Sequence, residues 1–140
     1  MALFMTVITK LTARGIYFDL EPIFIELNQR FFANQIDAKL RWGLSMKRAP
    51  KFSIRLGSYQ PHNRLITIHP CLDQAIVPLI CVERILFHEM NHQYWPAKIS
   101  PTGKRLVHHR EFNLFERRYP YLQEADTWIK ANLKLFLSGG

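Results

Sequence analysis

The pattern with the clearest chemical use is a pair of histidines four residues apart with a glutamate between them. Residues 88–92 read His-Glu-Met-Asn-His, which is the H-E-x-x-H spacing. On a helix, residues four apart lie one above the other, so His88 and His92 can direct two imidazoles at one tetrahedral metal ion. Glu89 would lie at the edge of that face, within reach of a water molecule at the open coordination position. Two neutral nitrogen ligands, an open position and a base are the parts of a hydrolytic zinc site.

The motif falls at the end of a segment that is expected to form a buried helix. An apolar run from Val77 to Phe87 leads into it, Pro78 suits a first helical turn, and Pro96 would stop the helix. These features predict a helix over residues 78–94. A chance match is the alternative for any short motif, but a helix is the element that this spacing requires.

A zinc enzyme of this type needs a third protein ligand, and the candidates downstream are His108, His109 and Glu111. They lie at the start of a helix expected over residues 108–118. At about 100° per residue, His108 points in the direction of the apolar side chains of that helix, whereas His109 and Glu111 point to either side. Because the apolar face must pack against the motif helix, His108 is predicted to complete a site for one zinc ion per chain. His109 is expected at the surface or among the residues that support the ligands, where Glu111 could also lie.

Other histidines and the cysteines are less suited to this metal. His62 and His69 fall in a turn and at a strand end without ligand spacing to the motif, so each is expected to be solvated or structural. Cys81 lies seven residues before His88, about 10 Å along a helix, which is too far to share its metal ion. Cys71 and Cys81 are too few for a disulfide framework, and free buried thiols in a reducing compartment are the simplest account.

Before the motif, the pattern predicts one helix and then three strands. Asp19 is a plausible N-cap, and apolar residues at helical spacing continue to about residue 33. Turn residues bound three strand candidates, which cover residues 39–45, 52–59 and 64–69. The turn at 60–63 joins the last two strands, which should therefore pair as a hairpin. The segment 1–18 is poorly assigned, and a helix is the expectation there.

After the motif, a loop over residues 95–107 leads to two helices, expected over 108–118 and 121–137 and separated by Pro120. No internal repeat, linker or low-complexity segment divides the chain. With 140 residues and 48% hydrophobic content, the sequence predicts a single domain over 1–140. The predicted class is α+β, with an N-terminal helix, a small three-stranded sheet, the motif helix and two closing helices.

The charge balance favours acidic partners. The chain has 19 Lys and Arg against 11 Asp and Glu, which gives a formal net charge of +8. Lys98, Lys104 and Arg105 fall in the loop between the predicted ligands and are the candidate contacts for sequence-independent DNA binding. A solvated basic surface is the alternative. No stretch is apolar enough to span a membrane, and the apolar start has no signal-peptide order, so a cytoplasmic or nucleoid-associated protein is predicted.

Several motifs occur in an order that resembles the SprT-like metallopeptidase family, over roughly residues 19–119. They are Asn28 and Phe31-Phe32 on the first helix, Trp42-Gly43 in a strand, the H-E-M-N-H motif, and His-x-x-Glu-Phe at 108–112. The resemblance implies a zincin-type fold, zinc held by His88, His92 and His108, and Glu89 as general base. It also implies proteolysis, which in some members is directed at proteins on DNA.

The chain departs from that family in three respects. His109 stands where the family often has Gly, and Arg110 stands where it often has Pro. Many members continue into a Cys-rich zinc ribbon or another nucleic-acid-binding segment, and this chain has only two cysteines. The DNA-linked role therefore has less support than the peptidase chemistry.

The function predicted from these observations is zinc-dependent hydrolysis of protein or peptide substrates. Glu89 would take a proton from the attacking water and pass it to the leaving amine. An edge strand near the cleft, with 64–69 as the candidate, could hold the substrate backbone by strand addition. Tyr94, Tyr59 and His109 are unranked candidates for a transition-state donor.

Two other classes of protein compete with this prediction. One is a non-catalytic, zinc-stabilised nucleic-acid-binding module, in which the metal only ties two helices together. Glu89 argues against it, because a purely structural site has no use for a base beside an open position. The other is a metal-dependent nuclease, which more often has clustered carboxylates, whereas the four Asp here are scattered. The natural substrate and the oligomeric state stay open.

Overall fold

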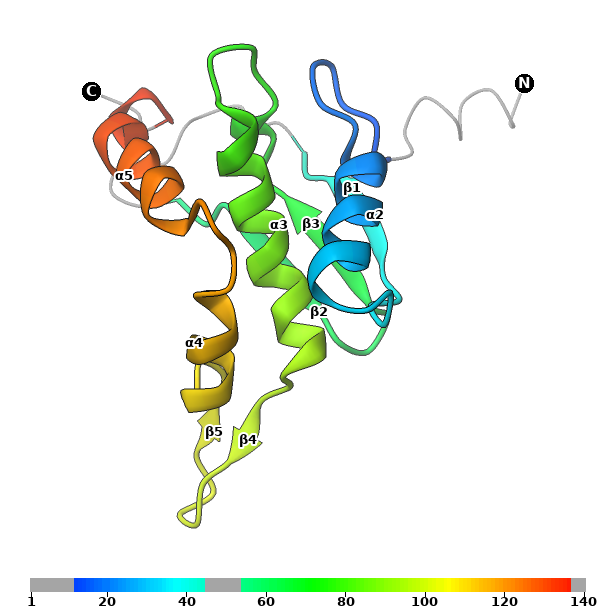
Figure 1. Ribbon diagram of the computed structural model, residues 1–140, viewed down its shortest axis with the longest axis vertical. Coiled ribbons are helices and arrows are strands. Elements are labelled where there is room, and N and C mark those ends of the chain that lie inside the picture. The colour runs from blue at the N-terminus through cyan, green and yellow to red at the C-terminus, as the bar shows by residue number, and fades with distance from the viewer. Residues whose placement is uncertain (1–11, 45–53, 137–140) are drawn as a thin grey trace.

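A long helix, α3 (Leu79–Tyr94), lies at the centre of the computed structural model and carries the H-E-x-x-H motif. The structure describes residues 12–44 and 54–136. A three-stranded sheet lies behind α3, with α2 on one side of the helix and α4 and α5 on the other (Figure 1). The flanking helices are α2 (Leu20–Phe31), α4 (Arg110–Glu116) and α5 (Leu122–Asn132). The predicted motif helix is thereby confirmed, with Pro78 at its N-cap.

Helix α2 begins as its sequence predicts. Asp19 caps its N-terminus by accepting a hydrogen bond from the Glu21 backbone N–H at 3.1 Å. The helix ends at Phe31, slightly before the predicted end at residue 33. Ala33 and Asn34 take positive φ angles, which a right-handed helix does not allow, and the chain turns toward the sheet there.

The segment before α2 is described from residue 12 onward and is not helical there. Its backbone N–H groups at residues 16–18 donate to the Asp73 carboxylate, which ties the segment to the loop before α3. The helix expected over 1–18 is therefore absent from residues 12–18, and residues 1–11 lie outside the described part of the chain.

The sheet has the order β1-β3-β2, so its last strand in sequence lies in the middle. The strands are β1 (Lys39–Trp42), β2 (Gly57–Gln60) and β3 (Leu65–Ile68). β3 pairs in parallel with β1 and antiparallel with β2, which confirms the predicted hairpin. The prediction that residues 64–69 form an edge strand is wrong, because β1 occupies the other side of β3. The edge strand that packs against α3 is β2.

All three strands are shorter than their predicted ranges. The sequence predicts strand at 43–44 and 54–56, where the structure has irregular backbone. Residues 45, 52 and 53, also at predicted strand ends, lie outside the described residues. The Leu56 carbonyl still accepts a hydrogen bond from the His69 N–H at 2.8 Å, so the approach to β2 follows the sheet without a full ladder.

Aromatic rings fill the core beside α3. Phe87 is fully buried, and its ring lies 5.0 Å from that of Phe32 and 5.7 Å from that of Phe115 on α4. Burying a Phe side chain contributes about 1.5–3 kcal/mol. Because Phe87 directly precedes His88, this packing fixes the rotation of α3 and directs the motif side chains to the other faces of the helix.

The segment between α3 and α4 is a small hairpin rather than the predicted loop. β4 (Lys98–Ile99) pairs antiparallel with β5 (Arg105–Leu106), and Gly103 takes a φ of +86° in the turn between them. The hairpin projects beyond the rest of the molecule (Figure 1). Strands of two residues are too short to produce an alternating pattern, which is why the sequence does not reveal them.

The two closing helices are confirmed, but both are shorter than predicted. α4 begins at Arg110, with His109 as its N-cap. α5 ends at Asn132, and a 3-10 helix, η2 (Leu133–Phe136), follows it. The predicted end at residue 137 lies outside the described residues. Within the described residues, no helix has the length and apolar character needed to cross a membrane.

Candidate active site

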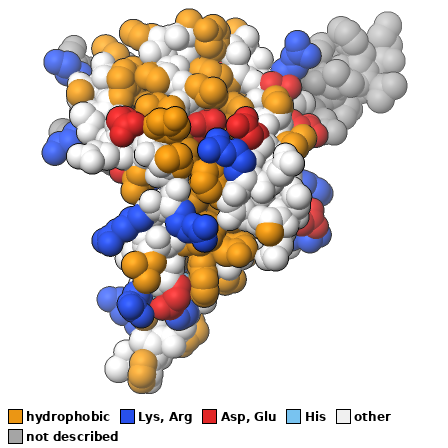
Figure 2. Space-filling model, in the orientation of Figure 1, with side chains coloured by type: hydrophobic (Ala, Val, Ile, Leu, Met, Phe, Trp, Pro, Cys, Tyr) orange, Lys and Arg blue, Asp and Glu red, His pale blue; other side chains and the backbone are white. Residues whose placement is uncertain are grey.

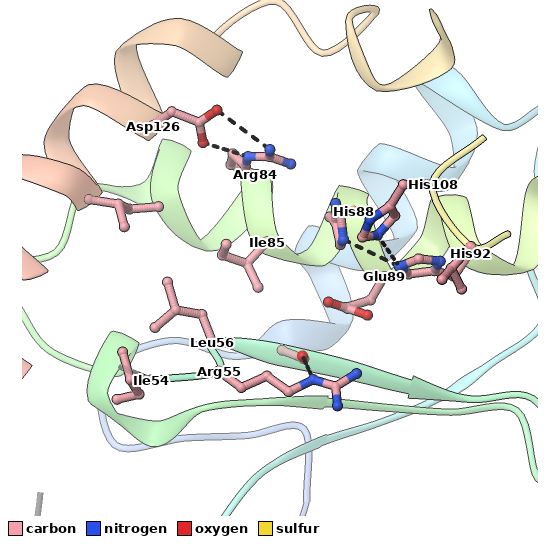
Figure 3. A pocket seen from close by; sticks show the side chains of 13 residues that line it. Ile54, Arg55, Leu56, Arg84, Ile85, His88, Glu89, His92, His108 and Asp126 are labelled. Carbon is pink, nitrogen blue, oxygen red and sulfur yellow. Dashed lines mark hydrogen bonds and ion pairs between the residues drawn. The ribbon is translucent and has the colours of Figure 1, made fainter. Parts of the chain in front are cut away.

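Three imidazoles meet on one side of α3. His88 and His92 come from successive turns of the helix, and His108 comes from the segment just before α4 (Figure 3). The Nε2 atoms of His88 and His92 lie 3.2 Å apart, and those of His92 and His108 lie 3.3 Å apart. The structure thus brings together the three residues that the sequence analysis selects as ligands.

The spacing and protonation of these nitrogens fit a tetrahedral zinc ion. Ligand atoms at about 2.0–2.1 Å from a tetrahedral zinc lie about 3.3–3.4 Å from one another. Burial, reinforced by the neighbouring imidazoles, lowers the pKa of His92 to about 4, and burial also lowers the pKa of His108. Both rings are therefore neutral at pH 7 and offer a lone pair to a metal. Three imidazoles without a fourth ligand in the described part of the chain form an open site.

His108 reaches the site by a route that differs from the predicted one. Its predicted position is the first turn of a helix, but α4 begins at Arg110 and His108 precedes the N-cap. The Asn113 side chain donates a hydrogen bond to the His108 carbonyl at 3.1 Å, which fixes the backbone ahead of the helix. The predicted helical position of His108 is therefore wrong, although its imidazole lies beside the motif.

Glu89 follows His88 on α3 and lines the cavity into which the imidazoles open. Its side chain is only 5% exposed, and it makes no hydrogen bond or ion pair within residues 12–44 and 54–136. Burial raises the pKa of Glu89 to about 7, against the opposing charges of His88 and Arg55. A carboxyl group with such a pKa can accept a proton and release it again near neutral pH, as the predicted general base must.

The buried carboxylate of Glu116 is a site residue that sequence reasoning missed. Its Oε2 contacts His88 Nδ1 and accepts a hydrogen bond from Arg84 at 2.9 Å, while Oε1 accepts one from Asn91 at 3.4 Å. Burial acts to raise the pKa of Glu116, but His88 and Arg84 outweigh it and lower this pKa. A carboxylate on Nδ1 leaves Nε2 of His88 directed at the other two imidazoles.

A signal for Glu116 is nevertheless present in the sequence. It lies four residues after Phe112 and three before Tyr119, so helical spacing places it on the apolar face of the same segment. An acidic residue on such a face is seldom buried without a partner. Arg84, one turn before His88 on α3, is that partner and also donates to Asp126 of α5 at 2.7 Å.

We expect Glu116→Gln to weaken zinc binding by roughly 10- to 100-fold, because the neutral amide no longer fixes and polarises the His88 ring. Competition with a chromophoric zinc chelator measures the affinity. Glu111→Gln is the matched control, since this carboxylate lies on the same helix but pairs with Lys98 of the hairpin. Equal zinc affinities for the two variants would contradict the assigned role of Glu116.

The imidazoles and Glu89 open into a cavity of 520 Å³ between α3 and the approach to β2 (Figure 3). Aliphatic side chains form much of its wall, and these are Ile54, Leu56, Ile85 and Ile129. A second cavity of 700 Å³ extends toward the hairpin. The two share the side chains Arg55, Glu89, His92 and Val107. An extended peptide therefore has room on both sides of the imidazoles.

Two of the predicted transition-state donors are tyrosines, and they lie in different surroundings. Tyr94 packs in the core, with its ring 5.4 Å from that of Phe32 and 4.8 Å from that of Phe115. Tyr59 lines the second cavity, and its hydroxyl accepts a hydrogen bond from the Gln93 amide at 2.9 Å. Only Tyr59 of these two borders a cavity that Glu89 also lines.

His109, the third predicted donor, is buried rather than on the surface, at 9% exposure. Its Nε2 donates to the Pro96 carbonyl at 2.9 Å, and its Nδ1 accepts from the Phe112 backbone N–H at 3.4 Å. Both ring nitrogens are therefore used in fixing the start of α4. Glu111, the other predicted supporting residue, contacts Lys98 and His109 rather than the three clustered imidazoles.

The residues predicted not to bind the metal are outside the imidazole cluster. His69 accepts a hydrogen bond from the Cys71 N–H at 3.0 Å, at the start of the 3-10 helix η1 (Pro70–Leu72). Cys81 is fully buried, with its Sγ 3.8 Å from the Ala125 carbonyl oxygen of α5. Burial raises the pKa of Cys81 to about 11, so this thiol stays protonated. Both cysteines are free thiols.

Comparison with known proteins gives a structural match without a sequence match. Neither a protein-family model nor a curated protein matches the chain. Among solved structures, it is similar to the metallopeptidase zymogen jannalysin of Methanocaldococcus jannaschii. The TM-score is 0.54 at 10% sequence identity, over 90% of this chain and 96% of that chain. At this identity the likeness shows the fold alone. The predicted α+β, zincin-like fold is confirmed, and the chain combines it with three clustered histidines suited to a metal ion.

Proposed function

We propose that this chain is a zinc-dependent metallopeptidase of the SprT-like type, with the metal held by His88, His92 and His108. The observation that carries the proposal is the set of three converging Nε2 atoms beside the buried carboxylate of Glu89, which pairs with no residue in the described part of the chain. The metallopeptidase fold and the order of the sequence motifs support it. A non-catalytic zinc-stabilised module is the alternative, but such a module has no use for Glu89 in the cavity wall.

Each residue of the site has a separate role in the proposed hydrolysis of a peptide bond. Zinc would supply Lewis-acid activation of the attacking water and of the scissile carbonyl. Glu89 accepts one proton of that water and donates it to the leaving amine, so the proton is conserved. Glu116 holds the His88 ring in one orientation throughout. The aliphatic cavity wall lowers the local dielectric and strengthens each of these polar interactions.

We propose the free edge of β2, rather than residues 64–69, as the site where the substrate backbone binds. Among the described strands, β2 ends the sheet, and it borders the first cavity through Gly57 and the second through Tyr59. An extended peptide can add to such an edge through main-chain hydrogen bonds, which leaves its side chains free to occupy the cavities. If it pairs antiparallel with β2, its chain runs from the second cavity toward the first.

Metal content tests the proposal directly. Native mass spectrometry of protein purified without added metal should show one zinc ion per chain, because the three nitrogens have the spacing of a zinc site. His92→Ala should remove the ion. The zinc-loaded chain should also cleave members of a proteome-derived peptide library, and a chelator should stop the cleavage. A folded chain without zinc affinity would contradict the proposal.

DNA binding at the hairpin is a second proposed function, and the position of its basic residues favours it. Lys104 and Arg105 are exposed and make no ion pair with any described residue, while Lys98 pairs with Glu111. Basic side chains border the lower part of the molecule, around the hairpin (Figure 2). The hairpin joins α3 to His108, so DNA held there would lie close to the cavity.

Charge reversal tests this second function. We expect Lys104→Glu with Arg105→Glu to weaken duplex DNA binding and to flatten its salt dependence, by about 0.9 in log–log slope for each phosphate that the protein no longer neutralises. Fluorescence anisotropy at several salt concentrations measures both quantities. Lys130→Glu with Lys134→Glu, at exposed positions on α5 and η2, lowers the net charge equally and serves as the control. If both double variants bind like the wild type, the hairpin is not a DNA site.

A further inference from the structure

We propose that Arg55 is the transition-state donor of this site and that its guanidinium binds the carbonyl oxygen of the scissile peptide as negative charge develops there. The inference rests on the proposed function. Sequence reasoning does not select Arg55, which has no motif spacing to the histidines. It precedes β2, lines both cavities, and lies across from the imidazoles on the side of Glu89 (Figure 3).

The placement of the other candidates leaves a role for such a donor. Both nitrogens of His109 are engaged away from the cavities, and Tyr94 packs in the core. Tyr59 borders only the second cavity, whereas all three imidazoles line the first. Arg55 lines the first cavity together with all three imidazoles, so its side chain borders the space in which the reacting carbonyl would lie.

One hydrogen bond fixes the stem of Arg55 and leaves its end free. Nε donates to the Gly57 carbonyl at 3.0 Å, two residues along the chain. The terminal amino groups make no hydrogen bond or ion pair with any residue in the described ranges 12–44 and 54–136. The guanidinium therefore retains four N–H donors, held in one plane, for an oxygen ligand in the cavity.

Gly57 brings this donor close to the site. A Cβ at position 57 would lie 2.9 Å from Glu89 Oε2 and 2.8 Å from Ile85 Cγ2, so any larger residue there would have to displace these side chains, and glycine lets β2 cross close to α3. Arg55 donates a hydrogen bond to the carbonyl of this same glycine. The place where β2 crosses α3 therefore determines where Arg55 lies relative to Glu89.

The chemistry requires a donor that does not itself transfer a proton. Glu89 carries the proton from water to the amine, whereas a guanidinium such as that of Arg55 does not give up a proton in proteins. Hydrogen bonds from a cation to an anionic oxygen are stronger than those to the neutral carbonyl, so Arg55 favours the transition state over the bound substrate.

A spectroscopic binding experiment tests the proposal without a natural substrate. Cobalt(II) replaces zinc, and its visible absorption reports binding of acetohydroxamate, whose anionic oxygens act as the probe. Arg55→Gln is expected to weaken acetohydroxamate binding by roughly 10- to 100-fold, the value of a charged hydrogen bond. Arg55→Lys should lose part of that affinity, because it keeps the charge without the planar fork. Neutral imidazole, as a second probe, should bind all variants equally.

Two controls make the result specific. Arg64→Gln removes a positive charge from the second cavity, where Arg64 pairs with Asp37 at 2.7 Å, and should leave acetohydroxamate affinity within a few-fold. In a Glu89→Gln background, Arg55→Gln should still weaken binding of acetohydroxamate. If the effect is lost in that background, Arg55 acts only through Glu89, and the proposal is overturned. Unchanged affinity in Arg55→Gln would overturn it as well. Failure of the chain to bind cobalt or zinc would instead overturn the proposed function itself.

Discussion

Glu89→Gln is expected to abolish peptidase activity while the chain keeps one bound zinc ion. The amide has the size of the carboxylate but cannot accept a proton from water, and general base catalysis contributes about 10²–10⁴-fold to rate. Cleavage of the proteome-derived peptide library, followed by mass spectrometry of new peptide ends, measures the loss. Native mass spectrometry of the same preparation verifies the zinc. Activity within a few-fold of the wild type would contradict the role of Glu89.

The same variant should be more stable than the wild type when both are free of metal. In the folded chain, burial raises the pKa of Glu89 from 4.5 to about 7. Between these two pH values the folded chain holds a proton that the unfolded chain has lost, and above them the ionised carboxylate opposes folding. The stability of the wild type therefore falls as pH rises from about 4.5 to about 7, on the order of 3 kcal/mol in total. Glutamine does not titrate, so Glu89→Gln should show this gain at pH 8 and lose it below pH 4.5 in urea unfolding experiments.

His108→Ala is expected to lower zinc affinity by more than about 100-fold. Removing a supporting residue typically costs 10–100-fold in metal affinity, and removing a ligand should exceed that range. Its Nε2 lies 3.3 Å from that of His92, which is the separation of two ligands on one zinc ion. Competition with a chelator of known affinity gives the constant.

His109→Ala separates the neighbouring histidine from this effect. It should leave zinc affinity within a few-fold but lower the free energy of unfolding by about 1 kcal/mol, because His109 caps α4 and bonds the Pro96 carbonyl. The opposite pattern, with zinc affinity lost in His109→Ala and retained in His108→Ala, would show that His109 is the ligand.

The sequence was sufficient for those parts of the site that depend on local geometry. His88 and His92 meet because helical spacing alone places residues four apart on one face, and the flanking prolines predict where that helix lies. His108 joins them from a segment outside any helix. Helical periodicity selects it on the assumption that it lies in a helix, which the structure corrects. The direction of the His108 side chain depends on where α4 begins. The N-cap of α4 is His109, and histidine is not among the residue types that usually mark the start of a helix in a sequence.

The features that the sequence did not predict depend on contacts between distant segments. The hairpin of β2 and β3 follows from a short turn, but the parallel pairing of β1 with β3 has no local signal, and it makes β3 central. Arg55 lies outside the predicted ligand spacing and gains its importance only because Gly57 crosses close to Glu89. Glu116 likewise becomes a supporting residue only when α4 packs beside Arg84.

The hairpin that separates the ligands has a consequence for how the chain can vary. His92 and His108 are 16 residues apart, and a bound ion would close the loop that contains β4 and β5. The free-energy cost of loop closure rises by only about 0.6 kcal/mol for each doubling of loop length. α4 is held against α3 independently, since Asn91 donates to the Phe112 carbonyl at 3.1 Å. Insertions or deletions at the hairpin tip should therefore leave the ligand geometry intact, which makes this the position where related chains can acquire new partners without altering the chemistry.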